Sequence, residues 1–241
     1  MTQTARYLLI QIRAADDVVR EQEIRCFVKA LDCEPEQLVT FDLLNETLTS
    51  EYLSRFDLVL IGGSGRYSVT SEEPWLYRAL EGLSLLVELS KPTFGSCWGF
   101  QALARATGGV VEHDLPNAEL GSHPVYLTEA GEQDPLFSTM PPTFLAYMGH
   151  EDHVVKLPPD TILLASSDRV PEQAFRYRDK PIYCTQFHPE LDHASLCARV
   201  SAYPEYCERI AAVPFDEFVA NCQQVTETSR LLRNFRDMIL R

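Results

Sequence analysis

The alternation of short apolar runs with amphipathic stretches in the first half of the chain constrains its fold more than any other feature. Four runs have the composition of buried β-strands: residues 7–12, 38–41, 56–61 and 91–94. Between and after them, apolar residues recur at helical spacing over 24–31, after Pro74, and over 98–107, where Gly108 and Gly109 end the pattern. Strands and helices that alternate with short connections predict a parallel sheet covered by helices on both faces.

The second half of the chain has a different sequence pattern. Proline, glycine and charged residues separate short β-type runs at 125–128, 144–148, 154–157, 162–165, 174–177 and 182–187. This pattern is typical of antiparallel hairpins, which would join the same sheet or lie beside it. After His188 the chain becomes helical again, with an apolar stripe from Phe215 to Ile239. Because no linker or repeat interrupts the sequence, we expect one α/β domain, residues 1–241.

The charge and cysteine content of the chain disfavour several classes of function. Lys and Arg number 21 against 35 Asp and Glu, a formal net charge of −14. An acidic chain without a basic run repels phosphate groups, so nucleic acid and anionic membranes are disfavoured as partners. We find no apolar stretch of the roughly 20 residues that a membrane span needs, and no signal peptide. Seven cysteines without paired spacing indicate free thiols, so we expect a cytoplasmic protein.

The segment 95–101, with the sequence GSCWGFQ, lies between an expected strand and an expected helix. A nucleophile flanked by small residues at such a junction is typical of a nucleophile elbow. The helix dipole and the free amides of the first turn favour a thiolate, the reactive form of cysteine. The amide of Trp98, the residue after the nucleophile, can donate to a tetrahedral oxyanion. We therefore interpret Cys97 as a nucleophile and the other six cysteines as core or surface thiols.

The segment 186–190, with the sequence QFHPE, supplies the groups that a cysteine nucleophile needs. Such a nucleophile requires a general base, and the base requires a group that orients it. His188 follows an expected strand, at the edge where open α/β sheets carry their active sites. Glu190, two residues further across a proline, can reach the second imidazole nitrogen and hold its tautomer. We interpret His188 as the base and Glu190 as its orienting group.

The glycine-rich segment 62–65, GGSG, directly follows the expected strand 56–61. Its backbone amides can donate to an oxyanion because no large side chain blocks the approach; a plain turn is the alternative. The segment fits neither glycine motif that binds phosphate groups. A metal site drawn from His150, His153 and His193 is disfavoured because these residues follow no established ligand pattern. We expect no metal site.

In this order, the three motifs resemble the class I glutamine amidotransferases. Residues 61–64 are similar to that family's oxyanion loop, and GSCWGFQ and QFHPE match its two catalytic motifs. The resemblance covers about residues 5–190 and leaves about 191–241 as a helical extension. Ser64 replaces a frequent proline, which removes a constraint on the loop, and Phe100 replaces a frequent polar residue. The family implies a flavodoxin-like, mostly parallel central sheet with helices on both faces, a small antiparallel β region and a C-terminal helical tail.

The resemblance also implies a role for each matched catalytic residue. Cys97 would attack the side-chain amide of glutamine, or another γ-glutamyl carbonyl, and form a thioester. His188 would transfer the proton, and Glu190 would orient His188. The backbone amides of Gly63 and Trp98 would hold the oxyanion. Water would then release glutamate.

The same resemblance implies residues for substrate binding. Gln101 would contact the substrate, and Asp152, His153 and Val154 would bind its amino-acid end. The family implies no cofactor for this chemistry.

The partner is implied by what the sequence lacks. Amidotransferases usually pass ammonia to a synthetase domain or subunit, and this chain has no phosphate loop and only a short helical tail. It therefore resembles stand-alone members of the family, similar to the amidotransferase part of GMP synthetase and to γ-glutamyl peptidases. A synthetase subunit in trans is one expected partner, and it would carry basic residues where it docks on this acidic chain.

Several alternatives stay open at this point. A γ-glutamyl peptidase that cuts glutathione-type conjugates would need no partner, and a cysteine hydrolase of another amide or ester would use the same three residues. A non-catalytic binding or regulatory module is a further alternative, although such proteins usually lose one of the three. The apolar stripe from Phe215 to Ile239 is first a core face, with a homodimer surface as its second interpretation.

Overall fold

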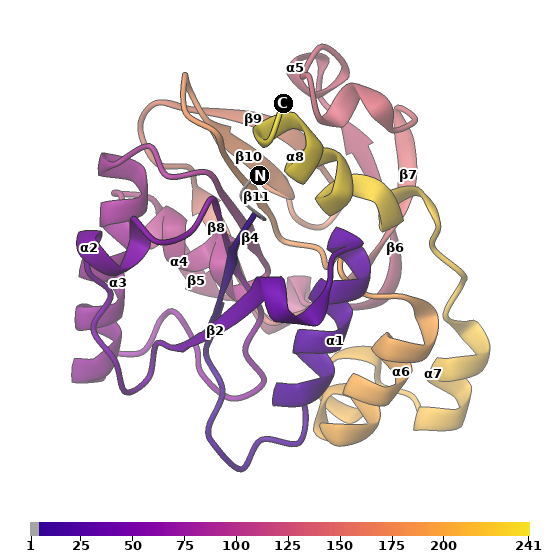
Figure 1. Ribbon diagram of the computed structural model, residues 1–241. Helices are drawn as coiled ribbons and strands as arrows, with labels where there is room; N and C mark the ends of the chain where they lie inside the picture. The colour runs from indigo at the N-terminus through magenta and orange to yellow at the C-terminus, as the bar shows by residue number, and fades with distance from the viewer. Residues whose placement is uncertain (1–4) are drawn as a thin grey trace.

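A nine-stranded sheet forms the centre of the computed structural model, which describes residues 5–241 (Figure 1). The strand order is β2-β1-β3-β4-β11-β10-β9-β6-β7. The first five strands in this order are all parallel. They are β2 (Leu38–Asp42), β1 (Tyr7–Gln11), β3 (Leu58–Ile61), β4 (Thr93–Ser96) and β11 (Ile182–Thr185). The prediction of a parallel sheet from the first half of the chain is therefore confirmed.

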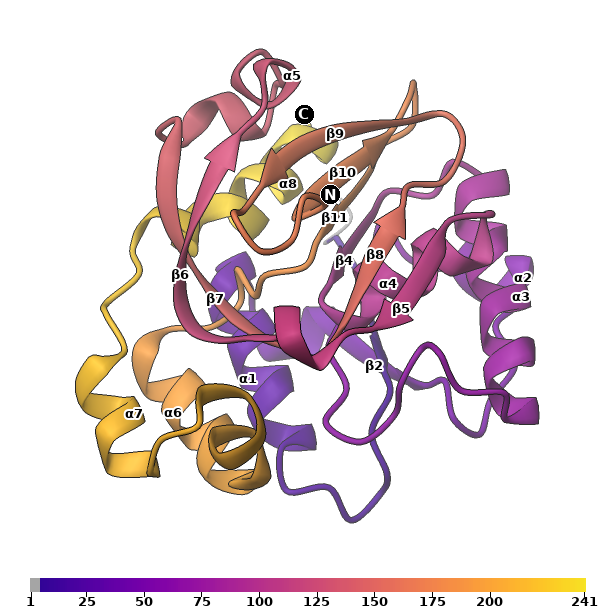
Figure 2. The same cartoon turned by 180° about the vertical axis from the view of Figure 1, so that it is seen from behind.

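The antiparallel strands occur in two places, where the sequence left two alternatives. Four of them continue the central sheet beyond β11: β10 (Ala174–Tyr177), β9 (Thr161–Ser166), β6 (Glu119–Leu127) and β7 (Thr143–His150). The other two, β5 (Val110–His113) and β8 (Asp152–Lys156), form a separate ribbon (Figure 2). The hairpin-rich half thus both extends the sheet and adds a second small one.

Helices cover both faces of the parallel strands, and the alternation of side chains along β1 shows how. Leu8 and Ile10 point into a core that contains α3 (Pro74–Glu88) and α4 (Trp98–Ala106). Tyr7 and Leu9 point into the opposite core, which contains α1 (Arg20–Leu31) and α8 (Leu231–Ile239). Figure 1 shows these two layers on either side of the sheet. Both faces are therefore buried, as a parallel sheet requires.

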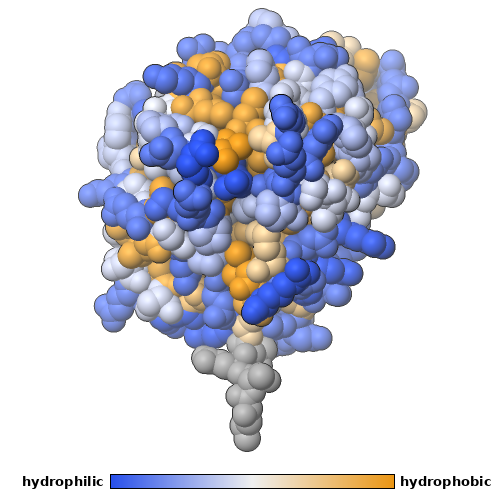
Figure 3. All heavy atoms as spheres, turned by 90° about the horizontal axis from the view of Figure 1, so that it is seen from above, coloured by the Kyte–Doolittle hydropathy of each residue, from blue (hydrophilic) through white to orange (hydrophobic). Residues whose placement is uncertain are grey.

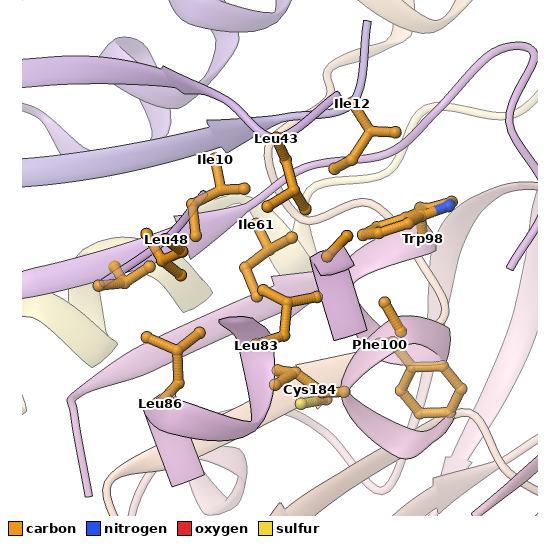
Figure 4. Close-up of a cluster of buried hydrophobic side chains, with 14 of the residues drawn as sticks. Ile10, Ile12, Leu43, Leu48, Ile61, Leu83, Leu86, Trp98, Phe100 and Cys184 are labelled. Carbon is orange, nitrogen blue, oxygen red and sulfur yellow. The ribbon is translucent and has the colours of Figure 1, made fainter. Parts of the chain in front are cut away.

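The core under α3 and α4 is shown in Figure 4, where Ile10, Ile61, Leu83 and Trp98 belong to one cluster of buried side chains. Cys184 of β11 lies in the same cluster, fully buried, and burial raises the pKa of its thiol. The interpretation of Cys184 as an inert core thiol agrees with this position.

Short elements complete the chain. They are α2 (Ser50–Leu53), α5 (Glu129–Glu132) and the 3₁₀ turns Pro35–Gln37, Leu115–Asn117, Phe137–Thr139 and Glu227–Arg230. None of the helices formed by residues 5–241 combines the length and the apolar character that crossing a membrane requires. On the face seen in Figure 3, hydrophilic and apolar residues are interspersed.

The C-terminal extension is helical, as expected, but its apolar stripe is not continuous. It forms α6 (His193–Ala202), a π-helical turn (Cys207–Ala211), α7 (Phe215–Asn221) and α8, with a break between the last two (Figure 1). Contacts with the sheet cause the break: the Gln223 amide donates to Ser122 Oγ (2.9 Å) and the Val225 amide donates to Tyr147 Oη (3.1 Å). As a result α7 packs beside α6, while α8 packs on the parallel strands.

Candidate active site

The connection between β4 and α4 forms a sharp turn with Cys97 at its apex. Cys97 has φ 51° and ψ −102°, a conformation that costs an L-residue about 1–3 kcal/mol. Its amide donates to the Thr185 carbonyl of β11 (2.8 Å), and its carbonyl accepts from the Gln101 amide (3.1 Å). The strained backbone is therefore held from both sides, which is the geometry expected of a nucleophile elbow.

Glycine is required on both sides of the elbow because the chain segments approach very closely. A Cβ atom on Gly95 would lie 2.9 Å from the carbonyl carbon of Gly99. A Cβ on Gly99 would lie 2.7 Å from the backbone and side chain of Ile61 in β3. The small residues that suggested an elbow in the sequence thus allow α4 to start directly against the sheet.

The Cys97 thiol lies at the N-terminus of α4 and donates to the Gly149 carbonyl at 3.6 Å. It lines an open cleft together with Trp98, Gln101 and Asp152. Positive partial charge at a helix N-terminus stabilises a thiolate. The position therefore combines a favourable field with access for a substrate.

His188 and Glu190 form a buried ion pair beside Cys97. His188 Nδ1 and Glu190 Oε1 are 2.7 Å apart, and both residues are 4% exposed. Burial lowers the pKa of His188, but the Glu190 carboxylate and Cys97 outweigh it and raise this pKa to about 9. Burial also raises the pKa of Glu190, but His188 and Arg199 lower it to about 2. At neutral pH the pair is therefore an imidazolium and a carboxylate.

The glycine loop after β3 lies against both catalytic candidates. A Cβ on Gly63 would be 3.0 Å from His188 Cε1 and 3.8 Å from Cys97 Cβ. Among residues 5–241, the amides of Gly63 and Trp98 donate to no backbone carbonyl. The Ser64 hydroxyl, which stands where proline is frequent, accepts from the Tyr67 amide (2.9 Å) and so restrains the loop by a hydrogen bond.

A buried polar network supports this loop from behind. Arg13 Nη2 donates to Glu23 Oε1 (2.9 Å), and Arg13 Nη1 donates to Asp17 and to Tyr203 Oη (both 3.2 Å). Arg13 and Glu23 are almost fully buried. A Cβ on Gly62 would lie 2.6 Å from Glu23 Oε1, so the carboxylate is in contact with the loop backbone.

We expect Glu23→Gln to destabilise the protein by about 3 kcal/mol, because it leaves the Arg13 charge buried with one carboxylate fewer. Glu72→Gln is the matched control, since Glu72 pairs with Arg105 at 3.1 Å but its side chain is 72% exposed. The control should cost less than about 1 kcal/mol. Urea unfolding of the three proteins measures both values, and equal midpoints for the two variants would contradict the structural role of Glu23.

The cleft brings together some of the expected substrate-binding residues and not others. Gln101 and Asp152 line it with Cys97. Gln101 Nε2 donates to the Asp152 carbonyl (2.6 Å) and to Gln186 Oε1 (3.2 Å). The Asp152 carboxylate accepts from Ser68 Oγ and lies 2.8 Å from His113 Nδ1. Both residues are therefore held in fixed orientations at the cleft wall.

The side chains of His153 and Val154 do not line the cleft. Val154 packs in the core under α3 and α4. His153 is buried with Nε2 3.9 Å from Asp114, and burial, together with His150, lowers its pKa. Their expected contact with the amino-acid end of a substrate stays a prediction, and here only their backbone could make it.

The histidines weighed for a metal site have separate partners. His150 Nε2 lies 3.1 Å from Glu119 Oε2, and His193 Nε2 donates to the Cys222 carbonyl (3.1 Å). Over the described part of the chain, no group of three or more His, Cys, Asp or Glu side chains is placed to hold a metal ion.

Four residues of the C-terminal extension reach the site and were not expected there. Tyr206 Oη donates to the Gly65 carbonyl (3.2 Å), and Arg209 Nε donates to Glu151 Oε1 (2.8 Å) at the cleft mouth. Arg199 contacts Glu190, and Tyr203 contacts Arg13. Their sequence carried no signal of this, because α6 ends at Ala202 and Tyr203 and Pro204 interrupt the helical stretch before Cys207–Ala211.

The family model described as glutamine amidotransferase class-I matches residues 21–198 of this chain. The chain belongs to this family. The matched region contains both GSCWGFQ and QFHPE, the motifs that carried the resemblance.

Relatives of this amidotransferase domain agree with the assignment. In Methanothermobacter thermautotrophicus, the A subunit of the glutamine-hydrolysing GMP synthase is 33% identical over 159 residues, 66% of this chain and 77% of the relative. The glutamine-hydrolysing GMP synthase of Thermosipho africanus is 40% identical over 110 residues, 46% of this chain but only 20% of the relative. The match thus spans one fifth of the longer enzyme.

The fold also matches a solved structure along nearly its whole length. A glutamine amidotransferase from Thermotoga maritima superposes with a TM-score of 0.76 at 20% identity, covering 98% of both chains. This likeness confirms the expected amidotransferase fold, including the helical C-terminal extension.

Proposed function

We propose that this chain is a glutaminase-type hydrolase that cleaves a γ-glutamyl amide through a thioester on Cys97. One observation carries the proposal: a strained, helix-capping cysteine lies beside a buried imidazolium–carboxylate pair and two backbone amides without carbonyl partners. Nucleophile, acid–base group and oxyanion donors are the parts that acyl transfer needs.

In the first half-reaction, the Cys97 thiolate attacks the γ-carbonyl carbon, and the carbonyl electron pair moves to oxygen. The Gly63 and Trp98 amides donate to that oxyanion. The imidazolium of His188 then gives its proton to the leaving nitrogen as the carbon–nitrogen bond breaks. Ammonia or an amine leaves, and the γ-glutamyl group remains on the sulfur.

In the second half-reaction, His188 acts as a base. It takes a proton from water, which attacks the thioester, and the sulfur leaves as a thiolate beside the restored imidazolium. Glutamate is released. Glu190 stays ionised throughout and holds the imidazole by its Nδ1.

A synthetase partner in trans is supported by the relatives, which are named as subunits of GMP synthase. Ammonia from glutamine would then pass to an acceptor that the partner activates. The chain's own net charge of −14 favours a partner with basic residues at the contact.

A γ-glutamyl peptidase is the second candidate, and the cleft mouth favours it. Arg66 and Glu205 lie there, and neither forms an ion pair with any residue from 5 to 241. Charged groups without partners suit a leaving group larger than ammonia, such as the peptide part of a glutathione-type substrate.

A turnover assay separates these candidates. We would incubate the purified full chain with glutamine, with glutathione and with a γ-glutamyl anilide, and measure ammonia, free glutamate and aniline. Cys97→Ala is the test variant, and Cys33→Ala is the matched control because Cys33 lies at the end of α1, outside the cleft.

Each outcome identifies a different function. Cys97-dependent release of glutamate from glutathione or the anilide indicates a self-sufficient γ-glutamyl hydrolase. Slow Cys97-dependent release of ammonia from glutamine alone indicates an amidotransferase that needs its synthetase. No turnover of any of the three would contradict the proposed hydrolase and favour the non-catalytic module.

A further inference from the structure

The C-terminal extension contributes side chains to the active site beyond the region that the family model matches, which ends at residue 198. The first of these is Arg199, in the last turn of α6. Its guanidinium is buried, and Nη1 lies 3.3 Å from Glu190 Oε1. That oxygen is the one that also faces His188 Nδ1 at 2.7 Å. Arg199 and His188 therefore share one carboxylate oxygen.

Arg199 is itself held in place from the other side of the site. Its Nε donates to Gln22 Oε1 of α1 at 3.2 Å. The side chain is thus fixed between α1 and Glu190, with little freedom to leave the carboxylate. A long, charged side chain is rarely buried unless it is paired, so the Glu190 contact explains why Arg199 tolerates this position.

The contact between Arg199 and Glu190 matters at the stage of the reaction cycle in which His188 is neutral. While His188 is an imidazolium, its positive charge is sufficient to stabilise the buried Glu190 carboxylate. When His188 gives its proton to the leaving nitrogen, that positive charge disappears, and a buried carboxylate beside a neutral imidazole tends to take up a proton. Arg199 keeps its charge at every stage, because a guanidinium does not titrate in this range.

We propose that Arg199 is a positioning residue that keeps the Glu190 carboxylate ionised and aligned on His188 while His188 passes through its neutral state. The inference rests on the proposed hydrolase function and deepens it, since it assigns part of the catalytic machinery to the C-terminal extension. Its effect is largest in the second half-reaction, where neutral His188 must act as a base.

Other ionisable groups near this cluster belong to several elements. Cys26 of α1, Arg13 after β1 and Tyr203 after α6 all lie close to it. Asp192 is nearby but pairs with Lys29 on the surface at 2.6 Å. Of the cations named here, Arg13 pairs with Glu23 and Asp17, Lys29 pairs with Asp192, and Arg199 pairs with Glu190. No other of these groups can replace its charge at Glu190.

The first test compares Arg199→Gln, Arg199→Lys and the control Arg233→Gln, which removes an α8 arginine paired with Asp32 far along the chain. We expect Arg199→Gln to lower kcat roughly 10- to 100-fold, the range for a group that orients a working histidine through its partner. KM should stay nearly constant, because the interaction does not touch substrate. Arg199→Lys should recover part of the loss.

The pH dependence separates positioning from structural support. Without Arg199 the carboxyl of Glu190 has a higher pKa, so the acid limb of the kcat profile should move to higher pH. Arg199→Lys should hold that limb near its original position, and Arg233→Gln should not move it. A loss of kcat with an unmoved limb, or wild-type kcat in Arg199→Gln, would overturn the inference.

A second measurement needs no substrate and keeps the inference testable if the proposed function fails. Alkylation of Cys97 by iodoacetamide reports the thiolate that the His188 imidazolium stabilises. In Arg199→Gln the acid edge of the alkylation rate should shift to higher pH, because protonated Glu190 no longer supports the imidazolium. If alkylation shifts but no γ-glutamyl compound is turned over, the positioning role stands and the proposed function falls. An unshifted edge in a folded variant would contradict the positioning role.

Discussion

Replacing Cys97 with alanine is expected to lower turnover of any γ-glutamyl substrate by a factor on the order of 10⁵, close to the effect of removing a hydrolase nucleophile. The variant has no sulfur to carry the acyl group, while the oxyanion donors and the cleft remain. Because alanine fills less space at a site that already borders an open cleft, the fold should be retained. Steady-state rates and thermal unfolding of the same preparations measure the two effects.

The matched control for this variant is Cys33→Ala, which removes a thiol that donates only to the Val28 carbonyl. It should keep wild-type turnover. Retention of most activity in Cys97→Ala would exclude the proposed thioester chemistry, and an equal loss in both variants would show that unfolding, not chemistry, caused it.

Replacing Glu190 with glutamine is expected to lower kcat by about 10³- to 10⁴-fold, because an amide can stabilise the wrong imidazole tautomer and cannot neutralise an imidazolium. The substitution should also move the pH profile of the activity in a defined direction. The carboxylate helps to raise the pKa of His188 to about 9 against the effect of burial. Without it, His188 loses its proton at lower pH, so the basic limb of the remaining activity should move down.

The measurement is the pH dependence of kcat/KM and of Cys97 alkylation for the wild type, Glu190→Gln and Glu190→Asp. The aspartate variant keeps the charge on a shorter side chain, so it should lose less activity and keep more of the basic limb. A basic limb that stays in place in Glu190→Gln would mean that Glu190 does not control the protonation of His188.

Most strand positions and the elbow could be predicted from the sequence because they depend on local pattern, but β5 and residues 119–124 of β6 were not expected. Apolar runs marked β1 to β4 and β11, and the small residues around Cys97 marked a turn that no larger side chain fits. The contact between His188 and Glu190 could be predicted equally well, because two residues on one short segment can reach each other whatever the rest of the fold.

The parts that could not be predicted depend on contacts between distant segments. Arg13 and Tyr203 are 190 residues apart, and Tyr206 reaches a loop 141 residues earlier, so no local pattern joins them to the site. The same is true of the break before α8: the periodic stripe of apolar residues favours one helix, but hydrogen bonds to Ser122 and Tyr147 stabilise an extended connection.

The C-terminal extension therefore has a different significance in the structure from the one its sequence suggested. The stripe of apolar residues was interpreted as a core face, and α8 does pack on the parallel sheet. Polar residues that precede this stripe reach the site instead: Glu205, Tyr206 and Arg209 line the cleft, and Arg199 contacts Glu190. The family resemblance pointed to Cys97, His188 and Glu190, and the extension supplies a side chain that contacts this cluster.

The most direct test of the account is to trap the acyl-enzyme. The wild-type chain would be mixed with a γ-glutamyl substrate, quenched in acid during turnover, digested and examined by mass spectrometry. We expect the peptide that contains Cys97 to gain the mass of one γ-glutamyl group, and to lose it on treatment with hydroxylamine. Turnover without any such adduct, or an adduct on another cysteine, would contradict a thioester on Cys97 as the centre of this site.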